Sequence, residues 1–114
     1  MHELSIVESL ITLCEENALS NNAKRVQEVH VKIGRLSGIE IDLFKRCFET
    51  FRENSSFCKD SKLLLEITPL EILCLNCDQI SILKENIFKC PKCESIKYKI
   101  IQGEDLHLMR LVME

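Results

Sequence analysis

The chain has 114 residues, which is enough for one compact domain or for a small domain that carries a metal-stabilised module. Its 15 basic and 18 acidic residues leave a formal net charge of −3, and no basic stripe is present, which argues against a nucleic-acid partner. No apolar run approaches the roughly 20 residues that span a bilayer, and the N-terminus lacks a secretory pattern, so we expect a cytoplasmic protein without a membrane partner.

The first predicted element is an amphipathic helix. Apolar side chains recur at steps of three and four residues, which places them on one stripe. The stripe comprises Leu4, Val7, Ile11, Cys14 and Ala18. We expect the helix to end near residues 21–22.

A strand is predicted next, over residues 26–33, where the apolar period changes to two. The apolar face comprises Val29, Val31 and Ile33. His30 falls on the opposite, polar face and is interpreted as a solvated strand residue. The two glycines within residues 34–38 favour a turn after this strand.

A second amphipathic helix is expected to begin at residues 40–42 and to end by residues 54–56. Four of the chain's five phenylalanines lie within it or just after it, so it should supply the bulk of the core. Ser37 and Glu40 have the spacing of a capping box, in which each side chain bonds to the backbone N–H of the other residue.

Three further strands are predicted, over residues 62–68, 96–100 and 106–113. Pro69 ends or bends the first, and the second could return the chain to the main sheet. A helix is the competing interpretation of the third, because both of its faces are largely apolar. The predicted fold is α+β: two helices packed on a small, mainly antiparallel sheet, with an inserted zinc-ribbon-like module.

The strongest local signal is a pair of Cys-x2-Cys motifs separated by twelve residues, which comprises Cys74, Cys77, Cys90 and Cys93. This spacing is typical of a tetrahedral four-thiolate zinc site, although iron, in a redox protein, fits the same geometry. The surrounding segment, residues 70–99, is too short to offset its chain entropy by apolar burial, so metal binding should supply on the order of 10 kcal/mol. We therefore predict two domains, residues 1–69 plus 100–114 and a zinc-binding module of residues 70–99.

The remaining cysteines are Cys14, Cys47 and Cys58. The total of seven is odd, and a reducing compartment disfavours disulfides. Cys14 and Cys47 fall on the predicted apolar helix faces, where we interpret them as small hydrophobic residues.

The chain opens with Met1, His2 and Glu3, which together could form a second metal site. The α-amine, the backbone nitrogen of His2 and its imidazole can close fused chelate rings around one ion. The backbone nitrogen or the carboxylate of Glu3 can fill the remaining position. Nitrogen-rich planar coordination suits Ni(II) or Cu(II). The alternative interpretation is a mobile terminal residue without a role.

Taken in order, these motifs closely resemble the HypA/HybF family of hydrogenase maturation factors. The resemblance rests on the opening MHELS, the strand and turn VKIGRLSG, the phenylalanine-rich helix and the two cysteine pairs, and it covers essentially the whole chain. It implies a nickel metallochaperone that works with a HypB-like GTPase to deliver Ni(II) to [NiFe]-hydrogenase, through the large subunit or its maturation complex. In some bacteria such proteins also serve urease, which implies urease accessory proteins as partners.

The resemblance also implies roles for individual residues. His2 is the principal nickel ligand, Met1 and Glu3 complete the site, and Glu40 is a further carboxylate ligand. Residues 1–69 plus 100–114 become the nickel-binding domain, and the four cysteines of the module hold a structural Zn(II). Because no histidine follows either cysteine pair, the sequence gives no support to an exchange of zinc ligands with histidine, and His107 is interpreted as a strand residue.

The alternative function is a zinc-ribbon adaptor that binds protein or nucleic acid and carries no nickel. The lysines of residues 70–99 would favour it, but acidic residues nearly cancel their charge. We do not expect an enzyme, because the sequence has no nucleophile paired with a base and no phosphate-binding glycine loop, and four thiolates leave no open position for water.

Overall fold

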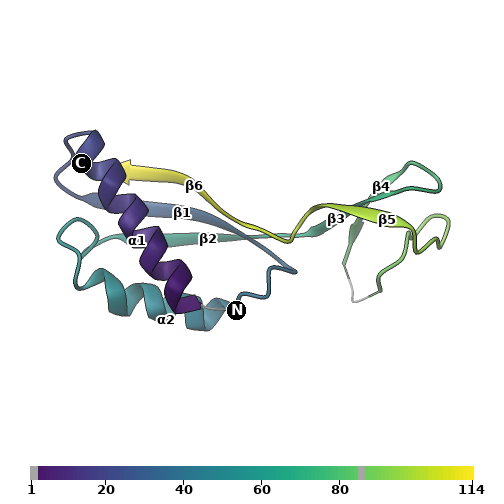
Figure 1. Cartoon of the computed structure of the whole chain (residues 1–114), viewed down its shortest axis with the longest axis horizontal. Coiled ribbons are helices and arrows are strands. Elements are labelled where there is room, and N and C mark those ends of the chain that lie inside the picture. The colour runs from purple at the N-terminus through teal and green to yellow at the C-terminus, as the bar shows by residue number, and fades with distance from the viewer. Residues whose placement is uncertain (1–2, 85–86) are drawn as a thin grey trace. The chain divides into compact units, whose positions relative to one another are not determined.

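The structure is a computed structural model that describes residues 3–84 and 87–114. Its helices and strands follow the chain in the order α1 (Glu3–Ser20), β1 (Val26–Gly34), α2 (Ile41–Arg52), β2 (Lys62–Thr68), β3 (Leu70–Cys74), β4 (Ile80–Leu83), β5 (Tyr98–Gln102) and β6 (Leu106–Met113) (Figure 1). The predicted α+β class is confirmed. None of the helices in this described part is long and apolar enough to cross a membrane.

The chain divides into two compact units, which we name the helix unit and the cysteine unit. The helix unit comprises Met1–Val31, Ile39–Glu66 and His107–Glu114, and the cysteine unit comprises Lys32–Gly38 and Ile67–Leu106. Strands β1, β2 and β6 each begin in one unit and end in the other. The predicted assignment of functions to residues 1–69 plus 100–114 and to residues 70–99 stays a prediction.

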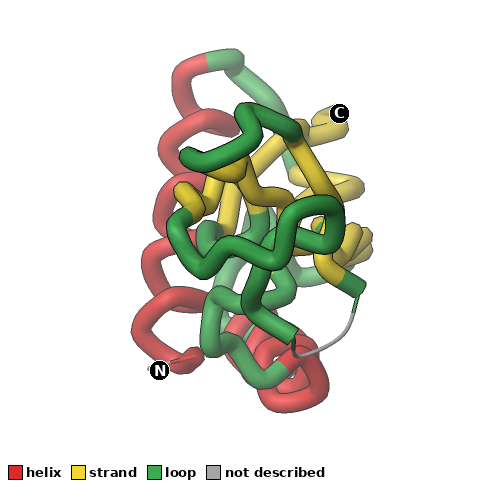
Figure 2. Tube along the Cα trace, turned by 90° about the vertical axis from the view of Figure 1, so that its right-hand side faces the viewer, coloured by secondary structure: helices red, strands yellow, loops and turns green. Residues whose placement is uncertain are grey.

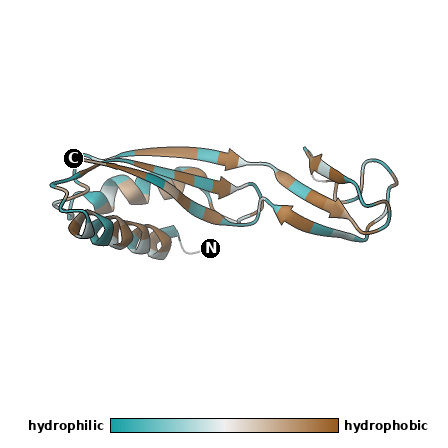
Figure 3. Cartoon of the chain, turned by 90° about the horizontal axis from the view of Figure 1, so that it is seen from above, coloured by the Kyte–Doolittle hydropathy of each residue, from teal (hydrophilic) through white to brown (hydrophobic). Residues whose placement is uncertain are grey.

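In the helix unit, α1 and α2 lie on the same side of the sheet that has the strand order β2-β1-β6 (Figures 1 and 3). The side chains between these layers are apolar and fully buried, and they include Val7, Val29, Phe44 and Phe48. Burying a side chain of this size stabilises a fold by about 1.5 to 3 kcal/mol. Packing of helix faces on a sheet therefore supplies this unit with a core of its own.

The buried stripe of α1 differs from the predicted one at its start. Glu3 is buried with the apolar residues of the stripe, whereas Leu4 is 45% exposed. Residues that follow each other in a helix point about 100° apart, so a stripe that passes through Glu3 and Val7 leaves Leu4 on the outer side. The prediction for Leu4 was wrong, and a glutamate takes its place in the buried stripe.

The predicted strands over residues 26–33, 62–68 and 106–113 are confirmed as β1, β2 and β6, so the helical interpretation of the last run was wrong. Along β1, Val29, Val31 and Ile33 are buried, and the residues between them are partly exposed. This alternation is the one expected of a strand with one face on the core.

In the cysteine unit, β3 is the central strand of a separate sheet with the order β4-β3-β5, and both pairings are antiparallel. The predicted return of the chain to the main sheet at residues 96–100 was therefore wrong. The cause is a small core in which Leu70, Ile72 and Leu83 are buried and Tyr98 and Ile100 pack against them. Loops and turns make up much of the rest of this unit (Figure 2).

Two glycines make a close backbone contact within the cysteine unit. A Cβ atom added at Gly34 would lie 2.3 Å from the carbonyl carbon and oxygen of Gly103. Gly103 has φ +113°, a conformation that L side chains rarely adopt, and a Cβ there would lie 2.7 Å from the Pro69 oxygen. The Gly34 N–H donates to the Asp105 oxygen at 2.8 Å, which holds the two segments together beside the contact.

Candidate metal centres

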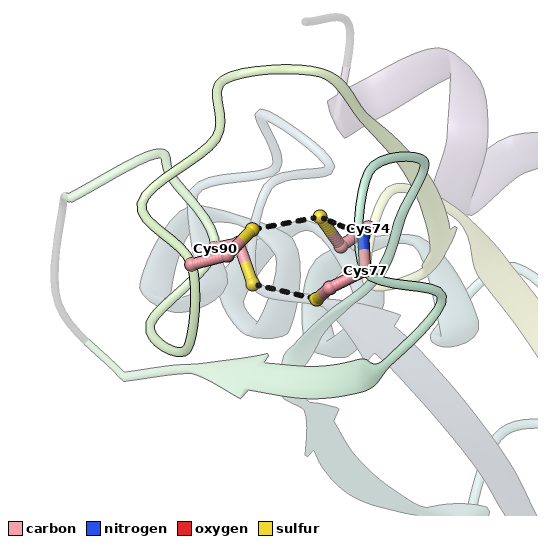
Figure 4. Close-up of side chains that lie close together, drawn as sticks. Cys74, Cys77 and Cys90 are labelled. Atoms are coloured by element: carbon pink, nitrogen blue, oxygen red, sulfur yellow. Dashed lines mark hydrogen bonds between the residues drawn. The ribbon is translucent and has the colours of Figure 1, made fainter.

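The four predicted cysteines lie together at one end of the β3–β4 hairpin and in the loop before β5. Their Sγ atoms all lie within 4.8 Å of one another. The Cys74–Cys93 and Cys77–Cys90 Sγ pairs are 3.5 Å and 3.7 Å apart. Figure 4 shows Cys74 and Cys77 on one side of the cluster and Cys90 on the other. A tetrahedral site with Zn–S bonds of about 2.3 Å separates its sulfurs by about 3.8 Å, so the geometry fits zinc.

Each cysteine pair forms the same kind of turn. The N–H of Asp78 donates to the Cys74 oxygen at 3.0 Å, and the N–H of Glu94 donates to the Cys90 oxygen at 2.9 Å. Asp78 and Glu94 both have left-handed backbones, with φ values of 57° and 61°. This conformation costs L residues other than Asn, Asp and Gly about 1 kcal/mol, so Glu94 is strained and Asp78 less so.

Amide groups of Asn76 and Cys77 point at the sulfurs of the cluster. The backbone N–H groups of Asn76 and Cys77 donate to the Cys74 Sγ at 3.4 Å and 3.5 Å, and the Asn76 side-chain amide donates to the Cys93 Sγ at 3.6 Å. Such donors stabilise the negative charge that four thiolates bring to a divalent ion. The sequence did not mark Asn76 as a site residue, because nothing in a Cys-x2-Cys motif indicates which intervening side chain faces the partner pair.

The surroundings of Cys93 and Cys77 shift the pKa values of these two thiols in opposite directions. The pKa of Cys93 is lowered to about 6, chiefly by the Asn76 amide and then by the backbone N–H of Ser95. For Cys77 the backbone N–H of Gln79 lowers the pKa, but burial and the neighbouring thiols outweigh it and raise the pKa to about 12. Zinc binding requires all four thiolates, so loading releases protons, and a bound ion would cross-link the two turns without offering an open position.

The second predicted site is described only in part, because Met1 and His2 lie outside the described residues. Glu3, the first described residue, is 6% exposed. Its Oε2 accepts a hydrogen bond from the backbone N–H of Glu40 at 3.1 Å. The structure therefore brings together Glu3 and Glu40, two of the predicted nickel ligands, which lie 37 residues apart in the sequence.

This hydrogen bond corrects the predicted capping box. Helix α2 begins at Ile41, its N-cap is Glu40, and the Glu40 side chain makes no capping hydrogen bond. In a capping box the third helical residue would bond back to the N-cap N–H. Here Glu3 of another helix makes that bond, and its negative charge lies at the N-terminus of α2, where the helix dipole favours it. Ser37 cannot be the N-cap, since it precedes the helix by four positions.

The other histidines lie on strands. His30 is partly buried, and its Nε2 lies 2.8 Å from the Glu28 Oε1. His107 is an exposed residue of β6, as predicted.

Fold and sites together define a small α+β protein with a four-cysteine metal cluster and a glutamate that joins the start of its first helix to the start of its second. The profile of the family described as "Hydrogenase/urease nickel incorporation, metallochaperone, hypA" matches residues 1–113. The chain belongs to this HypA family of nickel metallochaperones and hydrogenase maturation factors.

Relatives match over all or nearly all of their length. The hydrogenase maturation factor HypA of Campylobacter jejuni is 79% identical over 114 residues, which is all of both chains. The HypA of Aquifex aeolicus is 44% identical over all of this chain and 98% of its own. The solution structure of the Ni metallochaperone HypA from Helicobacter pylori, 40% identical, superposes with a TM-score of 0.74 and covers 99% of this chain and 97% of that one.

Proposed function

We propose that this chain binds Ni(II) at its N-terminus and delivers it for the maturation of [NiFe]-hydrogenase, while the four-cysteine cluster holds a structural Zn(II). The observation that carries the proposal is the match of almost the whole chain to a nickel-metallochaperone family, in a sequence whose second residue is histidine. His2 supplies the imidazole, and the backbone nitrogens of the first residues complete a planar set of ligands.

The contact between Glu3 and Glu40 sharpens the ligand assignment. The Glu3 carboxylate is buried and accepts a hydrogen bond from the Glu40 N–H. A carboxylate engaged in this way is a poor candidate for a ligand that must also let the ion go. We therefore assign to Glu3 a backbone ligand and a structural side chain. The exposed carboxylate of Glu40 supplies the additional oxygen ligand.

Transfer of the nickel ion requires a partner protein that binds at the N-terminal end of α1, beside the proposed nickel site. A groove of about 660 Å³ begins at Glu3 and runs between α1 and α2, with Leu4, Leu43 and Arg46 among its lining residues. A HypB-like GTPase, and then the hydrogenase large subunit or its maturation complex, would approach the nickel ion beside this groove. Urease accessory proteins are further partners of the same kind. Stepwise replacement of ligands then passes the ion on.

A Ni(II) titration of zinc-loaded, tag-free protein tests the proposal. The parent should bind one Ni(II) with release of protons, His2→Ala should lose the specific site, and the matched control His30→Ala should bind as the parent does. Affinity should fall as the pH drops through about 6.5, because the imidazole must be neutral to bind. Calorimetry and absorbance measure both effects.

The result can also reject the proposal. Equal nickel binding by His2→Ala and the parent would remove His2 from the site. No specific binding by the parent would leave the zinc-ribbon adaptor as the better account. An uncleaved N-terminal tag should act as His2→Ala does, since it removes the free amine next to residue 2.

A further inference from the structure

Strand β4 forms one border of the β4-β3-β5 sheet and pairs with β3 in an antiparallel register. The Cys74 N–H donates to the Gln79 oxygen at 3.0 Å, and hydrogen-bonded pairs alternate with non-hydrogen-bonded pairs along such a register. The N–H and C=O groups of Ile80 and Ile82 therefore point away from β3, toward the outer edge of the sheet. Within the described residues, no backbone or side-chain group bonds to them.

The side chains of these two residues are apolar and exposed. Ile80 and Ile82 are 55% and 50% exposed, and they share one face of the sheet because alternate strand residues do. Sheets usually protect an open edge with a bulge, a proline or a charged side chain. Residues 80–83 contain no charge and no proline, and their register with β3 is regular. The other outer strand, β5, has a bulge in its register with β3 and carries Lys99, so β4 is the less protected edge.

A hollow of about 340 Å³ lies beside the C-terminal end of β4. Its lining combines apolar side chains with two lysines and comprises Ile82, Leu83, Lys84, Ile87, Lys89 and Pro91. The Lys89 Nζ lies 3.2 Å from the Glu94 Oε1, whereas Lys84 is exposed and has no ion-pair partner within the described residues. A ligand that places an apolar group in this hollow can therefore also bring a carboxylate to Lys84.

We propose that the open edge of β4 binds an extended segment of a partner protein, which joins the sheet as an additional antiparallel strand. In this mode of recognition the backbone hydrogen bonds give affinity, and alternate side chains give specificity. Segment residues opposite Ile80 and Ile82 lie on the face of these isoleucines, so they should be apolar. The residue opposite Lys84 should be acidic, because it meets the free ammonium group. Read from its N-terminus, the segment has the pattern acidic-x-apolar-x-apolar.

A second copy of this chain fits the same edge less well. Two copies of β4 paired antiparallel about Ser81 would require Asp78 of one copy opposite Lys84 of the other. Asp78 has a left-handed backbone, with φ 57°, so the strand ends before it and Lys84 would stay unpaired. The proposed docking site lies wholly within the cysteine unit, and it does not depend on the proposed nickel function.

A synthetic peptide tests the geometry directly. The probe is the acetylated and amidated hexapeptide DTVTVT, titrated into nitrogen-15-labelled, zinc-loaded protein, and the readout is the change in amide chemical shifts. We expect the largest changes at Ile80 and Ile82. N-methylation of the first valine removes the N–H that meets Ile82, so it should weaken binding about tenfold or more. N-methylation of the second threonine is the matched control, because its N–H points away from β4, and this peptide should bind as the unmodified one does.

Substitutions in the protein test the side-chain contacts. Lys84→Glu should weaken binding of DTVTVT about threefold, and the charge-reversed peptide KTVTVT should recover that loss. Ile82→Ala should weaken binding of both peptides, whereas Ile101→Ala, at an exposed isoleucine of β5, is the matched control and should not.

Three results would overturn the proposal. The first is the absence of shift changes in β4 up to about 5 mM peptide. The second is equal binding by the two N-methylated peptides, since the edge would then make no backbone hydrogen bonds to the probe. The third is a set of shift changes at Ile80 and Ile82 that follows protein concentration without any peptide, which would assign the edge to a second copy of the chain.

Discussion

In the helix unit, Phe44 and Phe48 of α2 and valines of α1 and β1 are fully buried, whereas the apolar core of the cysteine unit consists of Leu70, Ile72 and Leu83 with two partly buried neighbours. A core of that size is small for the loops that it has to order. The four sulfurs at the far end of β3 can supply a second source of stability by binding a metal ion. We therefore expect the helix unit to fold by apolar burial alone and the cysteine unit to depend on a bound ion.

Removing a metal ligand should separate the two units most clearly. We expect Cys74→Ser, or chelation of zinc, to cost the cysteine unit on the order of 10 kcal/mol and to unfold it, while α1 and α2 stay folded. Amide hydrogen exchange should show lost protection in β3, β4 and β5 and retained protection in α1 and α2. Cys47→Ser is the control outside the cluster. Equal loss of protection in both units would contradict the comparison.

Substitutions at the contact between Gly34 and Gly103 measure how much close packing contributes to the stability of the cysteine unit. Gly34→Ala places a Cβ 2.3 Å from backbone atoms of Gly103, which cannot rotate away, so we expect a loss of about 3 kcal/mol even with zinc bound. Chemical denaturation of the zinc-loaded protein measures this loss. Gly38→Ala is the matched control, since Gly38 is exposed with φ 79° and reports the cost of conformation alone, about 1 kcal/mol. A smaller loss for Gly34→Ala than for Gly38→Ala would show that the contact relaxes.

The buried Glu3 carboxylate tests the helix unit. Glu3→Ala leaves the Glu40 N–H without its acceptor, so we expect a loss of about 2 kcal/mol, and Glu3→Gln, which keeps an acceptor oxygen, should lose less. Thermal unfolding measures the difference. Nickel stoichiometry should stay at one in Glu3→Gln if the backbone of Glu3 is the ligand. Loss of nickel binding in this variant alone would assign the carboxylate to the metal.

The smallest effect is expected at the cysteine turns. Glu94→Gly relieves a left-handed backbone and should stabilise the zinc-loaded cysteine unit by about 0.5 kcal/mol, although it removes an exposed ion pair with Lys89. Asp78→Gly should gain less, because aspartate tolerates this conformation better. The rate of zinc loss to a chelator is the measurement. Faster loss from Glu94→Gly than from the parent would mean that the ion pair outweighs the strain.

Features that depend on residues close together in the sequence could be predicted from it. The periods of apolar residues predicted α1, β1, α2, β2 and β6, and two Cys-x2-Cys motifs were enough to predict that four sulfurs would meet. Strands β3 and β4 were missed because their residues were assigned to a metal module, although Leu70, Ile72 and Cys74 already alternate as a buried face does. That alternation is the signal that could have found them.

Features that depend on distant residues could not be predicted. The capping box at Ser37 and Glu40 fitted the local spacing, but the fold brings the Glu3 carboxylate to the same N–H. No local pattern encodes this contact, since it arises from how α1 packs on the rest of the helix unit.

The bond between Glu3 and Glu40 also sets the reach of whatever the first two residues carry. Two residues span at most about 7 Å when fully extended. Because the Glu3 carboxylate accepts the N–H of Glu40 at the N-cap of α2, we expect an ion bound at the proposed nickel site to stay within about that distance of Glu3. A partner protein that takes up this ion would therefore have to bind close to the start of α2, where the ion is held.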